Sequence, residues 1–466
     1  MPQRNSHCVD ECCFIIMGGT GDLSKRKLIP ALYKLILENK ICACAIIAVS
    51  NAHTTIEEIL SQAQKFISNI DAEKWEKLKS ISYYFTMDFH DKEKYSALNK
   101  FIKKTEEKHK LNGNRIFYLA TMPEHFDVIT HNFSRYNIVS KSHERCDEEK
   151  SVFPWARVVY EKPFGFNLKS ARALNRRIKS AFCENQVFRI DHYLGKELVG
   201  NIILARFTNR ILEPIWNNKH IESVYIKISE TIGIEGRGEF YDIYGALKDI
   251  TQNHLLQIMS IVAMEPPKKL IAKYIRDEKA KVLKKISVEK ALVGQYEGYR
   301  QESNVNKNSR TETFAHVKLF INNKRWERVP FYLTTGKYLD KKETLVFIKF
   351  KPVACLLDFC PAQTNYFVIK IDPEKSMSLG LNTKVPGKWG QVMPVTMDFC
   401  HHAQFGANTP EAYETLLLDV IKGDHSAFVR ADEIEYSWKI FEKIDKKRGK
   451  LVFYPKGSKG PQGVPE

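Results

Sequence analysis

Residues 188–197 form a dense set of side chains that could do chemistry. They read Phe-Arg-Ile-Asp-His-Tyr-Leu-Gly-Lys-Glu. The members that are charged or carry an imidazole or a phenol are Arg189, Asp191, His192, Tyr193, Lys196 and Glu197. Cationic and hydroxyl donors of this kind can hold an anion, and a carboxylate among them can orient a base. A polar junction between a strand and a helix would have a similar composition, so the neighbouring segments must decide between the two interpretations.

A second candidate site is a glycine-rich turn near the N-terminus. Its residues are Gly18, Gly19, Thr20, Gly21, Asp22 and Leu23. The apolar run 14–17 precedes it, and apolar residues with helical spacing over 28–35 follow it. Between a strand and a helix, glycines let the backbone approach a pyrophosphate, and the helix N-terminus offers free N–H groups. The spacing lacks the full G-x-G-x-x-G pattern, so a plain turn remains an alternative.

Three further polar residues have apolar neighbours along the chain. Lys162 follows a short strand pattern, at the strand end where parallel sheets bind ligands. Asp249 and His254 lie within an apolar helical pattern that covers about 246–264 and stops at Pro266. Taken alone, Lys162 is explained as an exposed lysine in a turn, and His254 as a core histidine with satisfied hydrogen bonds.

The composition is that of a soluble globular protein with two domains. The chain has 466 residues, of which 43% are hydrophobic and 27% are charged. The formal net charge of +17 attracts polyanions such as nucleic acids, acidic membranes or phosphorylated small molecules. The basic residues are dispersed and form no long basic tail, so charge alone does not choose among these partners.

Cysteine usage points to a reducing compartment. The ten cysteines form neither a C-x-x-C zinc pattern nor a dense disulfide spacing, so free thiols are expected. Cys400, His401 and His402 could form a metal corner but lack further ligands, and no metal is expected. The sequence shows no signal peptide and no membrane span. We therefore expect a cytoplasmic protein without a membrane partner.

Strand and helix patterns alternate along the first part of the chain. Strand patterns occur at 14–17, 43–49, 81–85, 115–120 and 157–160. Helical periodicity separates them, which predicts a parallel sheet with helices on both faces. Residues 1–190 are therefore expected to form a Rossmann-like α/β domain that binds a dinucleotide.

Beyond residue 191 the strand patterns have a period of two. They occur at 224–228, 315–321, 345–350 and 366–371. These stretches predict an α+β domain over residues 191–466, with a large, mainly antiparallel sheet and the long helix at 246–264. Another helix is expected at 413–420, and the Gly- and Pro-rich stretch 455–466 is expected to be a loose tail.

Taken together, these segments resemble the glucose-6-phosphate dehydrogenase family. The matching segments are 18–23 followed by Lys25-Arg26-Lys27, 161–165, 189–197, 235–238, 252–256 and Gly336-Lys337. They occur in the family's order between residue 14 and about 455, and 189–197 is similar to the family's substrate-site signature. Chance agreement of six ordered segments is implausible. The resemblance therefore favours functional roles over the plain turn, the exposed lysine, the core histidine and the polar junction considered above.

The resemblance implies a role for each candidate residue. His254 is implied to be the general base beside Asp249 or Asp191, and Asp191 is preferred as the carboxylate that orients it. The residues implied to hold the sugar phosphate are His192, Tyr193 and Lys196. Those implied to hold the rest of the substrate are Lys162, Glu230, Asp249, Lys337 and Lys342. Those implied to bind the cofactor are Gly18, Gly19, Thr20, Gly21, Asp22, Leu23, Lys25, Asn51 and Lys162.

The implied reaction is oxidation of glucose 6-phosphate at C1 to 6-phosphogluconolactone, with hydride transfer to NADP, as the first step of the oxidative pentose phosphate pathway. Removing the hydroxyl proton needs a base, which an imidazole provides, and a paired carboxylate stabilises the imidazolium. A phosphate of about −1.5 to −2 charge accounts for the cations without a metal. The cofactor accepts the hydride.

Two departures from the family pattern concern dinucleotides. NADP-using members commonly carry arginine after the second strand, where this chain has Ser50 and Asn51. No acid is present there to bind ribose hydroxyls, so NADP is favoured, helped by Lys25 or His53, and use of NAD or of both stays open. Some members hold a second, structural NADP with basic residues that Thr334 and Glu343 replace. No structural NADP is therefore expected.

The resemblance also implies a homodimer or homotetramer formed through the antiparallel sheet. A rival interpretation of the net charge is a basic nucleic-acid-binding protein. The sequence lacks basic strands interleaved with aromatic residues and any recognisable binding module, so no nucleic-acid partner is expected. A second rival is an inactive relative retained as a scaffold, which conflicts with the presence of every implied catalytic group.

Overall fold

The computed structural model describes residues 9–139, 141, 153–354, 364–406 and 410–464. Two compact units make up the chain. The first comprises Met1–Gly195, Ile271–Arg276 and Pro410–Ile434, and the second comprises Lys196–Leu270, Asp277–Thr409 and Glu435–Glu466. The chain therefore returns to the first unit twice. The expected domain boundary at residue 190 stays a prediction.

The first unit is built on a six-stranded sheet in the order β3-β2-β1-β4-β5-β6. Its strands are β1 (Cys12–Met17), β2 (Cys44–Ser50), β3 (Ser82–Thr86), β4 (Arg115–Leu119), β5 (Ala156–Tyr160) and β6 (Val187–Arg189). Every neighbouring pair is parallel. This strand order is that of the Rossmann fold, so the α/β prediction is confirmed.

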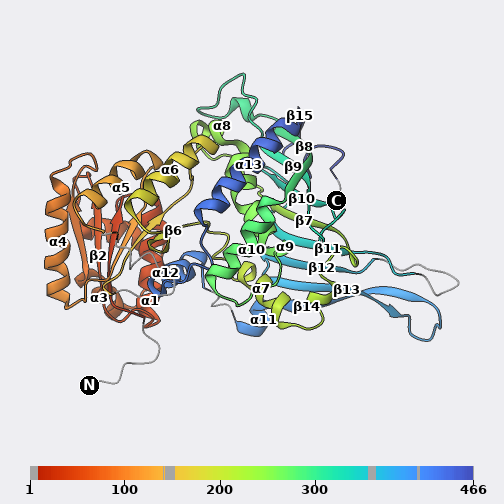
Figure 1. Cartoon of the computed structure of the whole chain (residues 1–466), viewed down its shortest axis with the longest axis horizontal. Coiled ribbons are helices and arrows are strands. Elements are labelled where there is room, and N and C mark those ends of the chain that lie inside the picture. Colours follow the sequence, from red (N-terminus) through yellow and green to blue (C-terminus); the bar gives the residue numbers. More distant parts are fainter. Residues whose placement is uncertain (1–8, 140, 142–152, 355–363, 407–409, 465–466) are drawn as a thin grey trace. The chain divides into compact units, whose positions relative to one another are not determined.

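Helices cover both faces of this sheet (Figure 1). On one face lie α4 (Lys94–His109), α5 (Phe126–Arg135) and α6 (Leu168–Ala181). On the other lie α1 (Ile29–Leu37), α2 (Ile56–Gln64), α3 (Ala72–Ser80) and α12 (Ala412–Lys422). Because both faces are covered, β1 and β2 are buried at every position and their sequences are continuous apolar runs.

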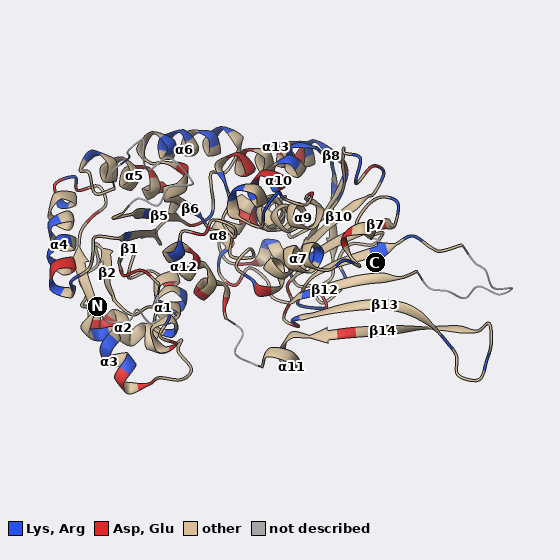
Figure 2. Ribbon diagram, turned by 60° about the horizontal axis from the view of Figure 1, so that its bottom comes forward, with Lys and Arg blue, Asp and Glu red and all other residues tan. Residues whose placement is uncertain are grey.

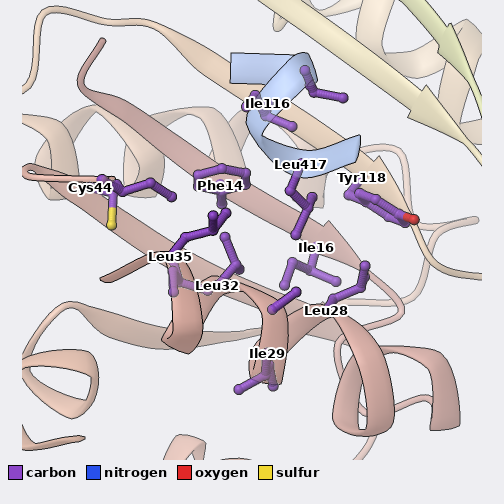
Figure 3. Close-up of a cluster of buried hydrophobic side chains, with 14 of the residues drawn as sticks. Phe14, Ile16, Leu28, Ile29, Leu32, Leu35, Cys44, Ile116, Tyr118 and Leu417 are labelled. Atoms are coloured by element: carbon purple, nitrogen blue, oxygen red, sulfur yellow. The ribbon is translucent and has the colours of Figure 1, made fainter. Parts of the chain in front are cut away.

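The segment 410–434 completes the core on the second of these faces. Figure 3 shows Leu417 of α12 in the same apolar cluster as Phe14 of β1 and Ile116 of β4. The Arg157 guanidinium donates to the Val420 carbonyl at the end of α12, at 2.6 Å. The helix expected at 413–420 is therefore present, and it packs on the parallel sheet of the first unit.

The second unit is built on a nine-stranded sheet in the order β14-β13-β12-β11-β7-β10-β9-β8-β15. Its strands are β7 (Ile221–Ser229), β8 (Ile286–Tyr296), β9 (Phe314–Ile321), β10 (Phe331–Gly336), β11 (Glu343–Phe350), β12 (Tyr366–Asp372), β13 (Ser376–Lys384), β14 (Val392–Cys400) and β15 (Arg448–Tyr454). Among these described strands, β7 with β10 and β8 with β15 are the parallel neighbours. The prediction of a mainly antiparallel sheet is confirmed.

The expected helix at 246–264 consists of two parts. A π-helix, η6 (Leu247–Leu255), leads into α9 (Leu256–Ala263), and Gly245 (φ 62°, ψ 177°) separates η6 from α8 (Gly238–Ala246). The remaining α-helices among the described residues are α7 (Glu197–Thr208), α10 (Ala272–Lys284), the short α11 (His401–Phe405) and α13 (Ala431–Lys447). All eight residues of α9 are buried, and six of the eight are apolar, the exceptions being Gln257 and Ser260.

The expectation of free thiols throughout is wrong. Cys42 and Cys183 are disulfide-bonded. Cys12, Cys13, Cys44 and Cys400 are free. The other four, Cys8, Cys146, Cys355 and Cys360, lie outside the described residues. Sequence spacing could not reveal the oxidised cysteines, because a disulfide depends on spatial approach.

The stretch after Pro455 is also ordered differently from the expectation. Up to residue 464 it is not a loose tail, because its backbone bonds to the loop after β10. The Gly457 N–H donates to the Tyr338 carbonyl at 2.8 Å, and the Asp340 N–H donates to the Ser458 carbonyl at 2.9 Å. The C-terminal stretch therefore supports the segment that carries Lys337.

Charged residues of both signs are interspersed on most helices (Figure 2). Helix α6 differs, because its sequence LKSARALNRRIKSA contains five basic residues and no acidic one. In the described parts of the chain, none of the helices has the length and apolar character needed to cross a bilayer.

Candidate active site

The glycine turn lies at the carboxyl edge of the parallel sheet, between β1 and the first helix. Gly18 has a φ of 94°, and a Cβ atom there would lie 2.3 Å from the Ala120 carbonyl oxygen. Only glycine fits this position. Helical residues begin directly after Gly21, and η1 (Ser24–Leu28) continues into α1. The turn and the helix N-terminus offer N–H groups to dinucleotide phosphates.

The end of β2 is tied to this turn. The Thr20 hydroxyl donates to Ser50 Oγ at 3.1 Å, and Ser50 Oγ lies 2.8 Å from the Tyr84 hydroxyl. Asn51 follows and is exposed, whereas the Lys25 ammonium donates to Gln62 Oε1 at 2.8 Å. Thr20 and Asn51 therefore lie at neighbouring strand ends, where a Rossmann fold holds the ribose.

Residues 188–195 continue this edge beyond β6. Arg189 is buried and pairs with Glu184 at 2.6 Å, so it has a structural role. Asp191 is also buried, and its Oδ1 accepts from the Tyr193 N–H at 3.0 Å. The rings of His192 and Tyr193 lie 4.9 Å apart. The Asp191 side chain thus closes an Asx turn on the Tyr193 backbone, and this turn carries Asp191, His192 and Tyr193.

The segment 410–434 packs against the residues on either side of this turn. The Phe188 ring stacks on His425 at 3.8 Å, and the Val429 N–H donates to the Arg189 carbonyl at 3.0 Å. Burial lowers the pKa of His425 well below its usual range, which keeps the stacked imidazole neutral. A Cβ atom on Gly195 would lie 2.7 Å from Leu416 Cγ, so α12 approaches the chain closely there. Sequence reasoning missed this support.

Lys162 lies at the same edge, two residues after the end of β5. The neighbouring strand β4 leads to Ala120, which contacts Gly18, and the neighbour on the other side, β6, leads to Asp191. The parallel topology of the first unit therefore gathers the glycine turn, Lys162 and the turn at Asp191 along one edge.

A cluster of cations in the second unit surrounds a carboxylate. Lys196 precedes α7, and its Nζ lies 3.5 Å from Asp372 Oδ2. Lys342 Nζ lies 3.9 Å from the same oxygen. Burial lowers the pKa of Lys196, and Asp372 opposes that effect. Sequence reasoning found both lysines and missed Asp372, which has no local signal.

A second polar cluster occupies the carboxyl ends of β7 and β10. These strands are adjacent and parallel, so Glu230 and Lys337 emerge side by side, with Lys337 Nζ 2.5 Å from Glu230 Oε2. Lys337 Nζ also lies 5.2 Å from the centroid of the Tyr241 ring. The Tyr454 hydroxyl donates to the Lys337 carbonyl at 2.7 Å and fixes the backbone there.

The π-helix η6 carries Asp249 and His254. His254 is buried, and its N–H donates to Asn253 Oδ1 at 2.6 Å. Burial and then the Asp249 charge raise the pKa of Tyr241, which places Asp249 near the ring that also faces Lys337. Single π-helical turns are frequent at functional sites. The pairing of His254 with Asp191 joins residues of the two units and stays a prediction.

No group of three or more His, Cys, Asp or Glu residues suited to a metal occurs among the residues with described positions. The cysteine and histidine at 400 and 401 therefore gain no further ligand within that set.

A doubly wound parallel sheet with a glycine turn, joined to a unit that carries a buried imidazole and paired cations and carboxylates, defines a dinucleotide-dependent oxidoreductase. Two protein-family models match the chain. "Glucose-6-phosphate dehydrogenase, NAD binding domain" matches residues 15–201, and "Glucose-6-phosphate dehydrogenase, C-terminal domain" matches residues 203–466. The chain belongs to the glucose-6-phosphate dehydrogenase family, whose members use a nicotinamide cofactor.

Individual relatives agree over nearly the whole chain. Glucose-6-phosphate 1-dehydrogenase of Chlamydia muridarum is 40% identical over 98% of this chain and 94% of its own length. The Bacillus subtilis enzyme is 36% identical over 96% and 94%. A solved glucose-6-phosphate dehydrogenase in complex with glucose-6-phosphate is 33% identical, with a TM-score of 0.90 over 98% of this chain and 96% of that one.

Proposed function

We propose that this enzyme oxidises glucose 6-phosphate at C1 to 6-phosphogluconolactone with NADP as acceptor, the first step of the oxidative pentose phosphate pathway. The observation that carries the proposal is the pair of cation–carboxylate clusters in the second unit, Lys196–Asp372 and Lys337–Glu230. The first suits a phosphate and the second suits sugar hydroxyls. The solved relative that holds glucose-6-phosphate supports the choice of substrate.

His254 is proposed to accept the proton of the C1 hydroxyl while the C1–H bond breaks with its electron pair and the C1 carbonyl forms. Asp191 stabilises the resulting imidazolium. The nicotinamide, when bound, takes the electron pair and hydrogen as hydride. His192, Tyr193 and Lys196 hold the phosphate. The remaining substrate contacts are proposed to come from Lys162, Glu230, Asp249, Lys337 and Lys342.

The cofactor is proposed to bind at the glycine turn, through Gly18, Gly19, Thr20, Gly21, Asp22, Leu23, Lys25, Asn51 and Lys162. NADP is preferred to NAD, because no acid follows β2 to repel the 2′-phosphate and Asn51 can donate to it. Use of NAD alongside NADP is the alternative. No structural NADP is proposed, because Thr334 and Glu343 stand where that site needs basic residues, and Glu343 occupies Lys227 in an ion pair at 2.7 Å.

Spectrophotometry of nicotinamide reduction tests the function. Purified protein is supplied with glucose 6-phosphate and either NADP or NAD, and glucose without phosphate is the matched control. We expect reduction with glucose 6-phosphate, a higher kcat/KM with NADP than with NAD, and little reduction with glucose. No reduction with either cofactor would refute the proposal.

The enzyme is further proposed to be a cytoplasmic homodimer or homotetramer without a nucleic-acid partner. Two Arabidopsis relatives are named as cytoplasmic enzymes, at 40% and 39% identity. The disulfide-bonded Cys42 and Cys183 count against a strongly reducing compartment. Thiol labelling of freshly lysed cell fractions tests the location, and light scattering tests the oligomeric state.

A further inference from the structure

A buried carboxylate to which the proposed mechanism gives no role lies directly before Lys162. Glu161 follows β5 and is 9% exposed. Its Oε1 accepts from the Tyr118 hydroxyl at 2.5 Å and from the Tyr413 hydroxyl at 3.2 Å. Tyr118 belongs to the adjacent strand β4 and Tyr413 to α12, so two distant parts of the first unit converge on one carboxylate oxygen.

The same carboxylate acts on Lys162 in two ways. It accepts the Lys162 backbone N–H and lies close enough to the ammonium for their charges to interact. Burial raises the pKa of Glu161, and the two phenols and Lys162 oppose that effect. The carboxylate therefore contacts the Lys162 backbone and places a negative charge near the Lys162 ammonium.

Tyr413 extends this cluster toward the turn at Asp191. Burial is the largest cause of the raised pKa of Tyr413, followed by Glu161 and then by the charge of Asp191. Tyr413 therefore lies near two carboxylates of the candidate site. Such a network is costly to leave half satisfied, because each buried polar group needs its partners.

We propose that Glu161 is a positioning residue that acts through Lys162, holding the ammonium ready for substrate while Tyr118 and Tyr413 hold Glu161. Lysine has a flexible side chain that loses freedom on binding, and a fixed anion at its base lowers that cost. The inference rests on the proposed function, because Lys162 is a substrate contact only there. A purely structural role for Glu161 is the alternative.

A double-mutant cycle separates the two roles, because only residues that act together show coupling. Glucose 6-phosphate binding is measured by calorimetry for the full chain, for Glu161→Gln, for Lys162→Ala and for the double variant, with thermal melting of each. Glu161→Gln should weaken binding about tenfold, as expected for a charge-assisted contact. In the Lys162→Ala background the same change should have no further effect. Tyr413→Phe should weaken binding about two- to fivefold in the wild-type background and should have no effect in the Lys162→Ala background.

Glu414→Gln is the matched control. Glu414 is a buried carboxylate of the same helix, α12, and it pairs with Lys34 of α1 at 3.4 Å. This change should lower the melting temperature and leave binding unchanged. Equal losses from Glu161→Gln in both backgrounds, or no loss in either, would overturn the inference. If Glu161→Gln fails to fold, the Tyr413→Phe cycle decides by the same criterion. Lack of binding by the wild-type chain would instead refute the proposed function.

Discussion

Asp372 Oδ2 lies 3.5 Å from the Lys196 ammonium, in the cluster proposed to receive the substrate phosphate. The carboxylate neutralises part of the charge that should attract the phosphate. Asp372→Asn should therefore lower the KM for glucose 6-phosphate about two- to fivefold, a small effect because the pair is partly exposed. Initial rates at low and high salt check this, since screening should shrink the gain.

The control for this change is Glu374→Gln. Glu374 pairs with Lys370 at 2.6 Å on the same stretch and is more exposed. Its removal should leave the KM unchanged.

Because Asp372 opposes the lowering of the Lys196 pKa, Asp372→Asn should also make the alkaline rise in KM begin at lower pH. If Asp372→Asn has a higher KM for glucose 6-phosphate than wild type at neutral pH, Asp372 instead helps to bind the substrate.

His254→Asn should lower kcat by about 10²- to 10⁴-fold, because the proton acceptor is lost. Binding of glucose 6-phosphate should stay largely intact, as measured by calorimetry. His316→Asn is the control, because His316 is another buried histidine of the second unit, with its pKa lowered by burial to about 4. The control should retain kcat. Full activity of His254→Asn would remove His254 from the role of base.

Asn51→Arg should lower the KM for NADP roughly tenfold, because a guanidinium can pair with the 2′-phosphate that an amide cannot neutralise. The KM for NAD, which lacks that phosphate, is the internal control and should change little. Steady-state kinetics with each cofactor give the ratio. An unchanged ratio would mean that the 2′-phosphate binds elsewhere.

Stability should depend on the protonation of Asp419 in α12. Burial and then the nearby Asp424 raise the pKa of Asp419 from 3.8 to about 7. The folded state therefore binds this proton more tightly than the unfolded state, and the contribution is lost as pH rises from about 4 to about 7. Asp419→Asn should raise the melting temperature at pH 8 relative to wild type and give no such gain at pH 4.

Asp424→Asn tests the cause of this effect. Without the neighbouring charge, the pKa of Asp419 should fall, and the loss of stability should be complete at a lower pH. Melting curves of both variants between pH 4 and pH 8 make the comparison. Parallel curves for wild type and Asp419→Asn would show that Asp419 titrates normally.

Gly195→Ala should destabilise the turn before Lys196 by about 1–3 kcal/mol, as overpacking does. The new Cβ would lie 2.7 Å from Leu416 Cγ and 2.8 Å from the Ala412 carbonyl oxygen. The displaced turn should also weaken glucose 6-phosphate binding, because Lys196 follows it. Adding Leu416→Ala should relieve the first contact and restore part of that affinity, although the cavity left by the leucine side chain lowers stability. No rescue would assign the defect to the backbone contact with Ala412.

Much of the fold could be predicted because it has a local signal. Continuous apolar runs and helical periodicity indicated most of the parallel sheet, whose strands are buried on both faces. Alternating stretches such as 224–228 and 366–371 indicated the antiparallel sheet. The three-residue strand β6 and the two-part helix at 246–264 were missed as such, because short strands and π-helical turns leave little trace in periodicity.

The sequence by itself determined the family, the glycine turn and the identity of the candidate acid–base and cationic residues, because these depend on residue type and near spacing. The tertiary structure alone decided which side chains meet. Tyr413 reaches Glu161 across 252 residues, and Asp372 at the end of β12 reaches Lys196 at the start of α7. Such contacts arise when packing of apolar faces brings distant segments together, and no local pattern encodes that approach.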